Sequence, residues 1–305
     1  MNCLPANTIS PRVNPGGRID FSRLFMPEEL TPLYHTPGFA RLDARQRLRY
    51  NQIHGLYFNE QTMFFEKSLA RNVLGYFLSQ ALPAELKAGL GRFLFEEEQH
   101  TEMFRCLNRD CAAEIYSQRD FYFITVPPVM AGALNFVSTR PEWFPFLLWL
   151  MRLQEERALF FGQRFLKQAD ALEPHFVAVQ RQHVGDEVGH VRWDDALLDW
   201  VWPRTGFLCR QINTRILAWM IDEYFSTPKR ATVRVVAELI KEFPELKSQF
   251  AGFRRELVEL GHDKNFRKSL YCQENVPNTF KRFNAWPEFQ PLKAVMPGYV
   301  PAAEQ

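Results

Sequence analysis

The sequence predicts an all-α protein, built as a four-helix bundle with additional helices toward its C-terminus. Apolar residues recur at three- and four-residue steps along much of the chain, which is the period of one helix face. No alternating apolar–polar pattern of the kind typical of a half-buried strand competes with this one. Prolines 83, 141 and 174 stand where periodic stretches begin or end. The chain has 305 residues, of which 46% are apolar, so a sizeable core can form.

The first two long helices follow a segment of different composition. Residues 1–41 are rich in proline and glycine, and we expect them to form an extended N-terminal arm over the domain. From Asp43 the apolar period predicts one long amphipathic helix, which Pro83 ends. A second helix is predicted over Ala84–Tyr116. Helices one and two should therefore pack as an antiparallel pair.

A second pair of helices is predicted after a connection. Residues 117–140 contain a Pro-Pro step and are expected to form this connection, with a short helix near Met130. The third helix is predicted from Pro141, a favourable first-turn position, to Asp170, and the fourth from Pro174 to Trp200. Two or three further helices are expected between residues 206 and 270. These assignments give a bundle domain over residues 42–270 and a coil tail over residues 271–305.

Composition and charge exclude several classes of protein. The 37 basic and 35 acidic residues leave a formal net charge of +2, too balanced for a general argument for binding nucleic acid or an anionic membrane. The five cysteines are an odd number without a CxxC pair, which argues against a disulfide framework or a cysteine zinc site and favours a reducing cytoplasm. The most apolar window, Trp143–Met151, is about half as long as a membrane span, and no secretory signal opens the chain. We expect a soluble cytoplasmic protein.

Two Glu-x-x-His pairs carry the chemistry. The second predicted helix contains FEEEQHTEM, with Glu97 and His100 three residues apart, and the fourth contains RQHVGDEVGH, with Glu187 and His190 at the same spacing. Residues at this spacing share one face of a helix, so each pair can present a carboxylate and an imidazole to a common point. A four-helix bundle that binds two irons uses two such pairs and one Glu from each of the other two helices. The spacing therefore predicts a di-iron centre.

The two single carboxylates each have two candidates. The first helix offers Glu60 and Glu66, and the third helix offers Glu155 and Glu156. Glu66 and Glu156 each precede the Glu of the following pair by 31 residues, which is the equality expected of two similar antiparallel helix pairs. Mixed carboxylate and imidazole donors suit redox-active iron better than structural zinc.

A further pair at the same spacing has a simpler explanation. Glu259 and His262 in ELGHD also stand three residues apart. Gly261 and Asp263 beside them are signals of a helix end. We interpret this pair as a helix terminus and not as a metal site.

A third histidine extends the second metal-binding pattern. His183 lies four residues before Glu187 and seven before His190, so all three share one helical stripe. A di-iron bundle needs only two histidine ligands, one from each Glu-x-x-His pair. The third histidine therefore predicts that one iron has an extra imidazole ligand.

Two acidic residues next to the paired glutamates could orient the histidine ligands. Glu96 and Asp186 directly precede the paired glutamates, and each could accept the free ring N–H of a ligand His from the opposite helix. Ordinary solvated charge on the helix surface is the alternative for both. Four phenylalanines also flank the single carboxylates, and they could line a dry pocket over the irons, although we favour packed core for each: Phe64, Phe65, Phe160 and Phe161.

These motifs together resemble one family. The run QRLRYNQIHGLYFNEQTMFFE, then EEEQH, then Glu156, then HVGDEVGH is similar to the p-aminobenzoate N-oxygenase family of di-iron proteins, over roughly residues 35–200. The resemblance implies a ferritin-like bundle that holds two irons, with Glu97 and Glu187 as bridging ligands. By position it prefers Glu156 to Glu155. The ligand set that it implies is Glu66, Glu97, His100, Glu156, His183, Glu187 and His190, with no catalytic residue beyond these ligands.

The resemblance also implies a reaction. It is the O2-dependent oxidation of an amine, an arylamine carried through hydroxylamine and nitroso stages to a nitro group in a biosynthetic pathway. Electrons must come from outside, from a ferredoxin-type donor or a small reductant, because the chain has no flavin or nicotinamide fingerprint. A homodimer is also implied. Residues 55–65 contain no Lys or Arg to receive a substrate carboxylate, so the substrate is expected to differ from a simple aminobenzoate.

Three other functions are compatible with two bound metals. The first is C–H hydroxylation or desaturation, which the ligand pattern alone does not separate from N-oxidation. The second is a non-enzymatic ferritin-like iron protein, against which the third His and the long C-terminal part argue. The third is a radical-generating subunit, which would need a tyrosine beside the irons; Tyr57 is not convincingly placed for that role.

Overall fold

The computed structural model describes residues 17–225 and 229–301, and the secondary structure in these ranges is helical. The described residues contain no β-strand; one isolated bridge joins Leu24 to Leu172. The predicted all-α class is confirmed. None of the described helices is long and apolar enough to cross a lipid bilayer.

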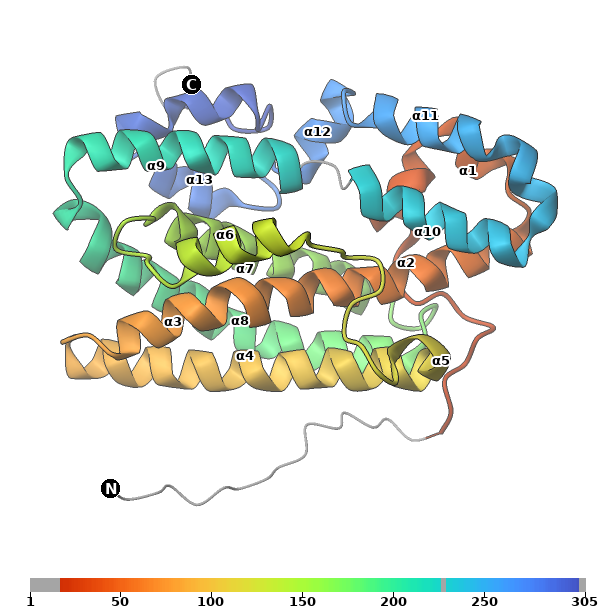
Figure 1. The fold of residues 1–305 in the computed structure, drawn as a ribbon, viewed down its shortest axis with the longest axis horizontal. Helices are drawn as coiled ribbons and strands as arrows, with labels where there is room; N and C mark the ends of the chain where they lie inside the picture. The colour runs from red at the N-terminus through yellow and green to blue at the C-terminus, as the bar shows by residue number, and fades with distance from the viewer. Residues whose placement is uncertain (1–16, 226–228, 302–305) are drawn as a thin grey trace.

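Four long helical rods lie side by side and form the bundle (Figure 1). They occur in the predicted order, and their ends lie close to the prolines that mark them in the sequence. The first rod is composite, and the other three are single helices. The rods are α2 (Ala44–Phe65) continued through a π-helical turn (Glu66–Ala70) into α3 (Arg71–Leu78), α4 (Ala84–Cys111), α7 (Phe146–Lys167) and α8 (Pro174–Val201).

The first rod begins with a capping box and is interrupted once. The Asp43 carboxylate accepts the backbone N–H of Gln46, whose side chain in turn accepts the N–H of Asp43. The rod then loses its α-helical pattern at the π-helical turn, which begins at Glu66. Turns of this kind are rare and occur often at functional sites. The apolar period predicts an unbroken helix here, because one wider turn leaves the pattern nearly unchanged.

Shorter helices complete the fold around the bundle. The connection after α4 contains α5 (Ala113–Tyr116) and α6 (Pro128–Ser138), and α6 is the short helix expected near Met130. In the described part of residues 206–270, four α-helices follow the bundle, against the two or three expected. They are α9 (Phe207–Met220), α10 (Lys229–Glu242), α11 (Phe250–Leu260) and α12 (Lys264–Leu270). Helices α10 and α11 lie over one end of α2, together with α1 (Pro37–Arg41) (Figure 1).

The two terminal segments are more ordered than their composition suggests. Residues 17–41 of the expected arm contain α1 and two single turns of 3₁₀-helix, Glu28–Leu30 and Pro32–His35; residues 1–16 lie outside the described ranges. The expectation of a coil tail is corrected for residues 271–301, which contain α13 (Pro277–Phe283) and a 3₁₀-helix (Pro287–Ala294). Residues 302–305 are not described.

Aromatic burial explains the order of the C-terminal segment. Pro277 and Pro287 occupy first-turn positions, where proline favours a helix instead of breaking one. Phe283 and Phe289 are fully buried and stack on each other, and both rings contact Trp149 of α7. The segment is therefore part of the main core.

Buried apolar side chains form two large clusters, one toward each end of the bundle. Along α4, residues 86–93 belong to the first cluster and residues 103–107 to the second, while Glu97 and His100 lie between them. Helix α8 meets the two clusters in the reverse order, and its Glu-x-x-His pair also lies between its two apolar ends. The predicted ligands thus lie at mid-height of the bundle, where the apolar core is interrupted.

Candidate metal centre

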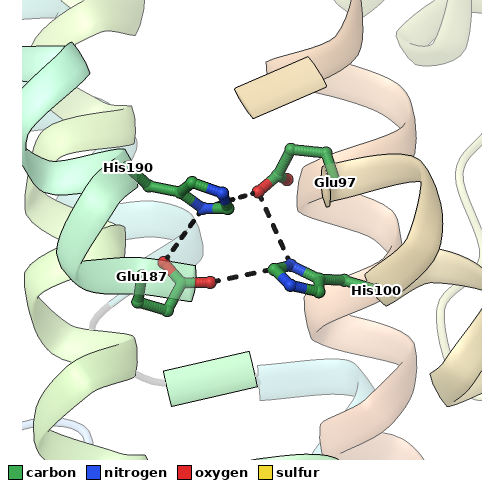
Figure 2. A group of neighbouring side chains, drawn as sticks. All are labelled: Glu97, His100, Glu187 and His190. Carbon is green, nitrogen blue, oxygen red and sulfur yellow. Dashed lines mark ion pairs between the residues drawn. The ribbon is translucent and has the colours of Figure 1, made fainter. Parts of the chain in front are cut away.

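The two Glu-x-x-His pairs face each other across the bundle. Glu97 and His100 project from α4 toward Glu187 and His190 of α8 (Figure 2). One ligand atom of each residue lies within 4.8 Å of those of the other three, and none of the four residues is more than 2% exposed. The helical spacing therefore brings all four side chains to one buried point.

The two carboxylates of this group lie between the two imidazoles. Nδ1 of His190 is 3.1 Å from Oε1 of Glu97 and 3.4 Å from Oε2 of Glu187. Nδ1 of His100 is 3.8 Å from Oε1 of each of the same two glutamates. A carboxylate shared by two imidazoles in this way is suited to bridge two metal ions.

Glu66 and His183 extend the group on one side. Nε2 of His183 lies 3.3 Å from Oε1 of Glu66 and 2.7 Å from Oε1 of Glu187, and Nδ1 of His100 lies 3.8 Å from the same Glu66 oxygen. Both residues are buried. Glu66 opens the π-helical turn, so the irregular turn sets the direction of its side chain.

Glu155 extends the group on the other side, and Glu156 does not. The Glu155 carboxylate lies 3.6 Å from Nδ1 of His190. The Glu156 carboxylate points elsewhere and accepts hydrogen bonds from the backbone N–H groups of Asn278 and Thr279 at 2.9 and 2.8 Å. Adjacent helical residues point about 100° apart, so only one of the two can face the centre. The prediction of Glu156 as a ligand is therefore corrected to Glu155.

The other candidate acids have structural roles. Glu60 on α2 accepts the hydroxyl proton of Tyr116 and the backbone N–H groups of residues 122–124, which fixes the connection after α4. Glu259 and His262 lie exposed at the end of α11, where Glu259 is 3.8 Å from Arg255. The interpretation of that pair as a helix end agrees with its position.

A cation fits the polar atoms at the centre. Both carboxylate oxygens of Glu97 and of Glu187 are buried without a hydrogen-bond donor, and so are the Nδ1 atoms of His100 and His190. Their separations are ion-pair distances, but none has the geometry of a hydrogen bond. Buried acceptors that face one another without a proton or cation are costly. The arrangement is that of a ligand set.

Two further acids hold the far nitrogens of the imidazoles. Nε2 of His100 lies 3.1 Å from Asp186 on the opposite helix, and Nε2 of His190 lies 3.2 Å from Glu96. A carboxylate only accepts, so Nε2 carries the proton in each ring and the Nδ1 lone pair faces the centre. The hydrogen bond from His100 lowers the pKa of Asp186. These are the contacts that the sequence predicts for Glu96 and Asp186.

The pKa values reflect a surplus of buried negative charge. Burial and the charge of Glu97 raise the pKa of Glu66 to about 7. Burial and the charge of Glu187 raise the pKa of Glu155 well above its usual range. Burial lowers the pKa of His183, but Glu187 and Glu66 outweigh it and raise that pKa to about 10. Bound cations would stabilise the ionised carboxylates and remove the reason for these upward shifts.

A large cavity opens beside the centre. Its volume is about 880 Å³, and Glu66, Glu155 and His183 form part of its lining. The cavity is lined by α2, α7, α8 and the connection after α4, and also by residues 29–35, residues 220–225, residues 230 and 231, and residues 266–274. All four flanking phenylalanines line it, which corrects the preference for packed core: Phe64, Phe65, Phe160 and Phe161.

Sequence reasoning missed several contributors to this cavity, among them Arg157 and residues 266–274. Arg157 of α7 lines it two residues after Glu155, and residues 266–274 form one wall. The position of Arg157 beside a ligand candidate was the one available signal. Nothing in the local pattern of residues 266–274 connects them with the helices that carry the Glu-x-x-His pairs.

Comparison with known proteins agrees with the geometry. The model of the family described as P-aminobenzoate N-oxygenase AurF matches residues 14–250, which include all seven residues at the centre. No individual curated protein matches the chain. The matched range covers most of the sequence and the whole helical bundle. The chain therefore belongs to the p-aminobenzoate N-oxygenase family and is an oxidoreductase of the N-oxygenase type.

Proposed function

We propose that this protein uses two iron ions and O2 to oxidise the amine nitrogen of an arylamine, toward a hydroxylamine or nitro product of a biosynthetic pathway. The observation that carries the proposal is a buried array of four carboxylates and three imidazoles that borders an aromatic-lined cavity. The family match supports the same reaction.

The distances suggest how the array divides between two ions. Glu66 and His183 lie at one side and Glu155 at the other, while Glu97 and Glu187 lie between. One ion would then have two imidazoles and the other one, with two carboxylates shared. The proposed ligands are Glu66, His100 and His183 for the first ion, Glu155 and His190 for the second, and Glu97 and Glu187 for both.

The donor types favour iron. Carboxylate oxygens and imidazole nitrogens, without a thiolate, suit redox-active iron in a helical bundle. Bound ferrous iron would supply the electrons that make O2 reactive toward the amine. The role of the chain is to hold the ligands: Asp186 and Glu96 keep the Nε2 protons of His100 and His190 in place, so each Nδ1 stays available.

The cavity provides the second part of the function. Phenylalanine side chains on two sides of the centre can hold an aromatic ring by stacking and edge contacts. They also exclude water from the reacting nitrogen, which suppresses unproductive loss of oxidising equivalents. A cavity of this volume is within the range of small-molecule sites and exceeds the needs of a single benzene ring.

Metal analysis and a substrate panel test the proposal. The purified protein, reconstituted with ferrous iron under anaerobic conditions, should bind close to two irons per chain. After addition of O2 and reductant it should convert arylamines to N-oxidised products that mass spectrometry identifies. One zinc per chain, or no metal after reconstitution, would contradict the metal assignment. Products oxidised only at carbon would contradict the assignment of the reaction.

The electron donor and the assembly are further parts of the proposal. We infer an external donor, a ferredoxin-type protein or a small reductant, because the sequence has no flavin or nicotinamide fingerprint. We also infer a homodimer, which the exposed apolar residues Leu208, Ile212 and Trp219 on α9 support. Sedimentation of the protein as a monomer would contradict the homodimer. The four cysteines in the described ranges are free, which fits the cytoplasm.

A further inference from the structure

Two imidazoles of the centre come close to solvent on the side of α4 and α8. Nε2 of His100 is held by Asp186, and Nε2 of His190 is held by Glu96. The side chains of these two acids are 27% and 15% exposed. One carboxylate therefore separates each of these proposed ligands from bulk water. The cavity reaches the centre on the other side, along α2 and α7, so the centre has two separate approaches.

Two lines of side chains form the outer face of α4 and α8. Along each line the residues follow one another at steps of four, three and four, so each line is one stripe of its helix. Helices α9 and α13 pack on α7, and helix α10 packs on α2, so the later helices cover other sides of the bundle (Figure 1). All residues of the two lines are exposed or half-exposed: Ala88, Arg92, Phe95 and Gln99 on α4, and Arg181, Gly185, Val188 and Arg192 on α8.

The middle of the outer face is apolar. Phe95 is 57% exposed and Val188 is 65% exposed. Phe95 directly precedes Glu96, and Val188 follows Asp186 by two residues, so both lie at the level of the centre. A Cβ added at Gly185 would meet nothing within 4 Å, so packing within the chain does not require a glycine there. Apolar contacts surrounded by charged ones are typical of a protein–protein interface.

The charges on the two lines are all positive. Arg181 and Arg192 stand at the two ends of the α8 line, and Arg92 stands beside Phe95 on the α4 line. Neither line contains an acidic residue. The side chains of Arg92 and Arg192 are 73% and 71% exposed, so both protrude from the face.

The acids beside these arginines leave the protruding charge largely in place. Glu85 lies 3.4 Å from Arg192 but is itself 79% exposed, and exposed ion pairs are weak. Glu96 accepts Nε of Arg92 at 2.6 Å, but its other oxygen is turned inward to Nε2 of His190. The outer face is therefore suited to a partner with a negatively charged surface.

The position of the face suits the transfer of electrons. The rate of electron transfer falls steeply with the distance between donor and acceptor. A donor on this face is separated from the imidazoles of the centre by Asp186 and Glu96 alone. Electron-transfer complexes have small and transient interfaces, which two helical stripes can supply.

We propose that the outer face of α4 and α8 binds an acidic iron–sulfur protein that delivers one electron at each encounter. The inference rests on the proposed di-iron function and names the docking site of its electron donor. Each donor is oxidised by one electron, so two encounters reduce two ferric ions to ferrous ions. Arg92, Arg181 and Arg192 attract the donor, and Phe95 and Val188 form the apolar contact.

Docking can be measured without turnover. An acidic plant-type 2Fe–2S ferredoxin serves as the probe, and it is mixed with iron-loaded protein while both are oxidised, so no electron passes. Calorimetry should detect binding that weakens as ionic strength rises. The double variant Arg181→Glu, Arg192→Glu should weaken binding by about 10-fold or more at low ionic strength, because like charges then oppose each other. Phe95→Ser should weaken binding at low and at high ionic strength alike.

A matched pair of arginines provides the control. Arg254 and Arg255 are exposed on α11, so the double variant Arg254→Glu, Arg255→Glu changes the net charge equally on a different surface. It should bind the ferredoxin as the unchanged protein does. An equal loss in both double variants would show that only net charge matters. That outcome, the absence of binding, or unchanged binding after the α8 changes would overturn the inference. Sedimentation of Phe95→Ser as a monomer, where the unchanged protein is a dimer, would assign the face to a second copy of this chain and also overturn it.

Reduction and turnover then distinguish the docking site from the proposed function. In stopped-flow absorbance, the α8 double variant should oxidise reduced ferredoxin more slowly, while dithionite reduces its irons at the unchanged rate. If dithionite supports N-oxidation of arylamines but the variant reacts with ferredoxin at the unchanged rate, the proposed function stands and the docking site is wrong. If ferredoxin reduces the irons through this face but no arylamine is oxidised at nitrogen, the docking site stands and the proposed function is wrong.

Discussion

Nε2 of His190 on α8 lies 3.2 Å from the Glu96 carboxylate on α4, and the reverse contact joins His100 of α4 to Asp186 of α8 at 3.1 Å. Each helix therefore supplies both a ligand candidate and the acid that orients the candidate on its neighbour. Through these two contacts, the position of each helix determines the orientation of the imidazole on the other helix.

Glu96→Gln should weaken metal binding without removing a ligand. The amide does not supply the charge that holds the Nε2 proton of His190, and loss of such a partner costs about 10- to 100-fold in metal affinity. Competition with a chelator measures the change. Glu98→Gln is the control, because Glu98 on the same helix is half-exposed and pairs with Arg71. Equal iron affinity in the two variants would contradict the role of Glu96.

Glu155→Gln and Glu156→Gln should have opposite consequences. The first change should lower the iron content below two per chain with little loss of stability. The second should keep both irons, but it removes the buried charge that pairs with Arg152 and accepts from Thr279, at a cost of about 3 kcal/mol. Metal analysis and thermal unfolding of both variants measure the two effects. Loss of iron in Glu156→Gln alone would restore the prediction from sequence spacing.

Removing the metal should make stability depend strongly on pH. The pKa of Glu66 is raised to about 7 in the folded protein, above its usual value of 4.5, so the folded state binds more protons than the unfolded state between these values. Stability of the metal-free protein should therefore fall as pH rises from 4.5 to 7. His183 acts in the same direction, because its raised pKa of about 10 gives stability that is fully present below pH 6.5 and is lost progressively as pH rises from 6.5 to 10.

The measurement is the Tm of metal-free and iron-loaded protein between pH 5 and 8. Iron binds the deprotonated ligands, so in the loaded protein this fall should disappear or reverse. Glu66→Gln should flatten the slope of the metal-free protein. A metal-free Tm that increases steadily across the interval would show that the buried acids do not carry these pKa shifts.

Glu60→Gln should loosen the wall of the cavity formed by the connection after α4. The Glu60 carboxylate accepts three backbone N–H groups and the Tyr116 hydroxyl, and an amide cannot accept all four. We expect a loss of about 2–3 kcal/mol in unfolding free energy and a higher KM with iron content unchanged. Denaturant unfolding and steady-state kinetics test this. Unchanged stability would show that the connection is held elsewhere.

Spacing along the sequence predicts the cluster of Glu and His side chains because the proposed ligands on α4 and α8 are close together within each helix. Glu97 and His100 depend only on helix geometry, and so do His183, Glu187 and His190. The choice between Glu155 and Glu156 is not local. It depends on the rotation of α7, which Asn278 and Thr279 help to fix from more than 120 residues away. No pattern around residue 155 contains that information.

Two other departures from the sequence prediction have different causes. The π-helical turn at Glu66 is a single wider turn within the first rod. The spacing of apolar residues along the sequence does not reveal it. The aromatic and proline-rich composition of residues 271–301 is typical of coil when taken locally. These residues are part of the core because Phe283 and Phe289 pack against Trp149 of α7, which lies more than 100 residues earlier in the sequence.

The contact between Glu156 and Thr279 has a consequence for the order of events during synthesis. Every proposed ligand has been made once residue 190 leaves the ribosome, yet α7 receives its last buried partners only when residues 278 and 279 emerge. We therefore expect the nascent chain to contain every proposed ligand before α7 reaches its final packing. Limited proteolysis of stalled chains of increasing length would test this timing, and full protection of α7 in a chain that ends near residue 273 would contradict it.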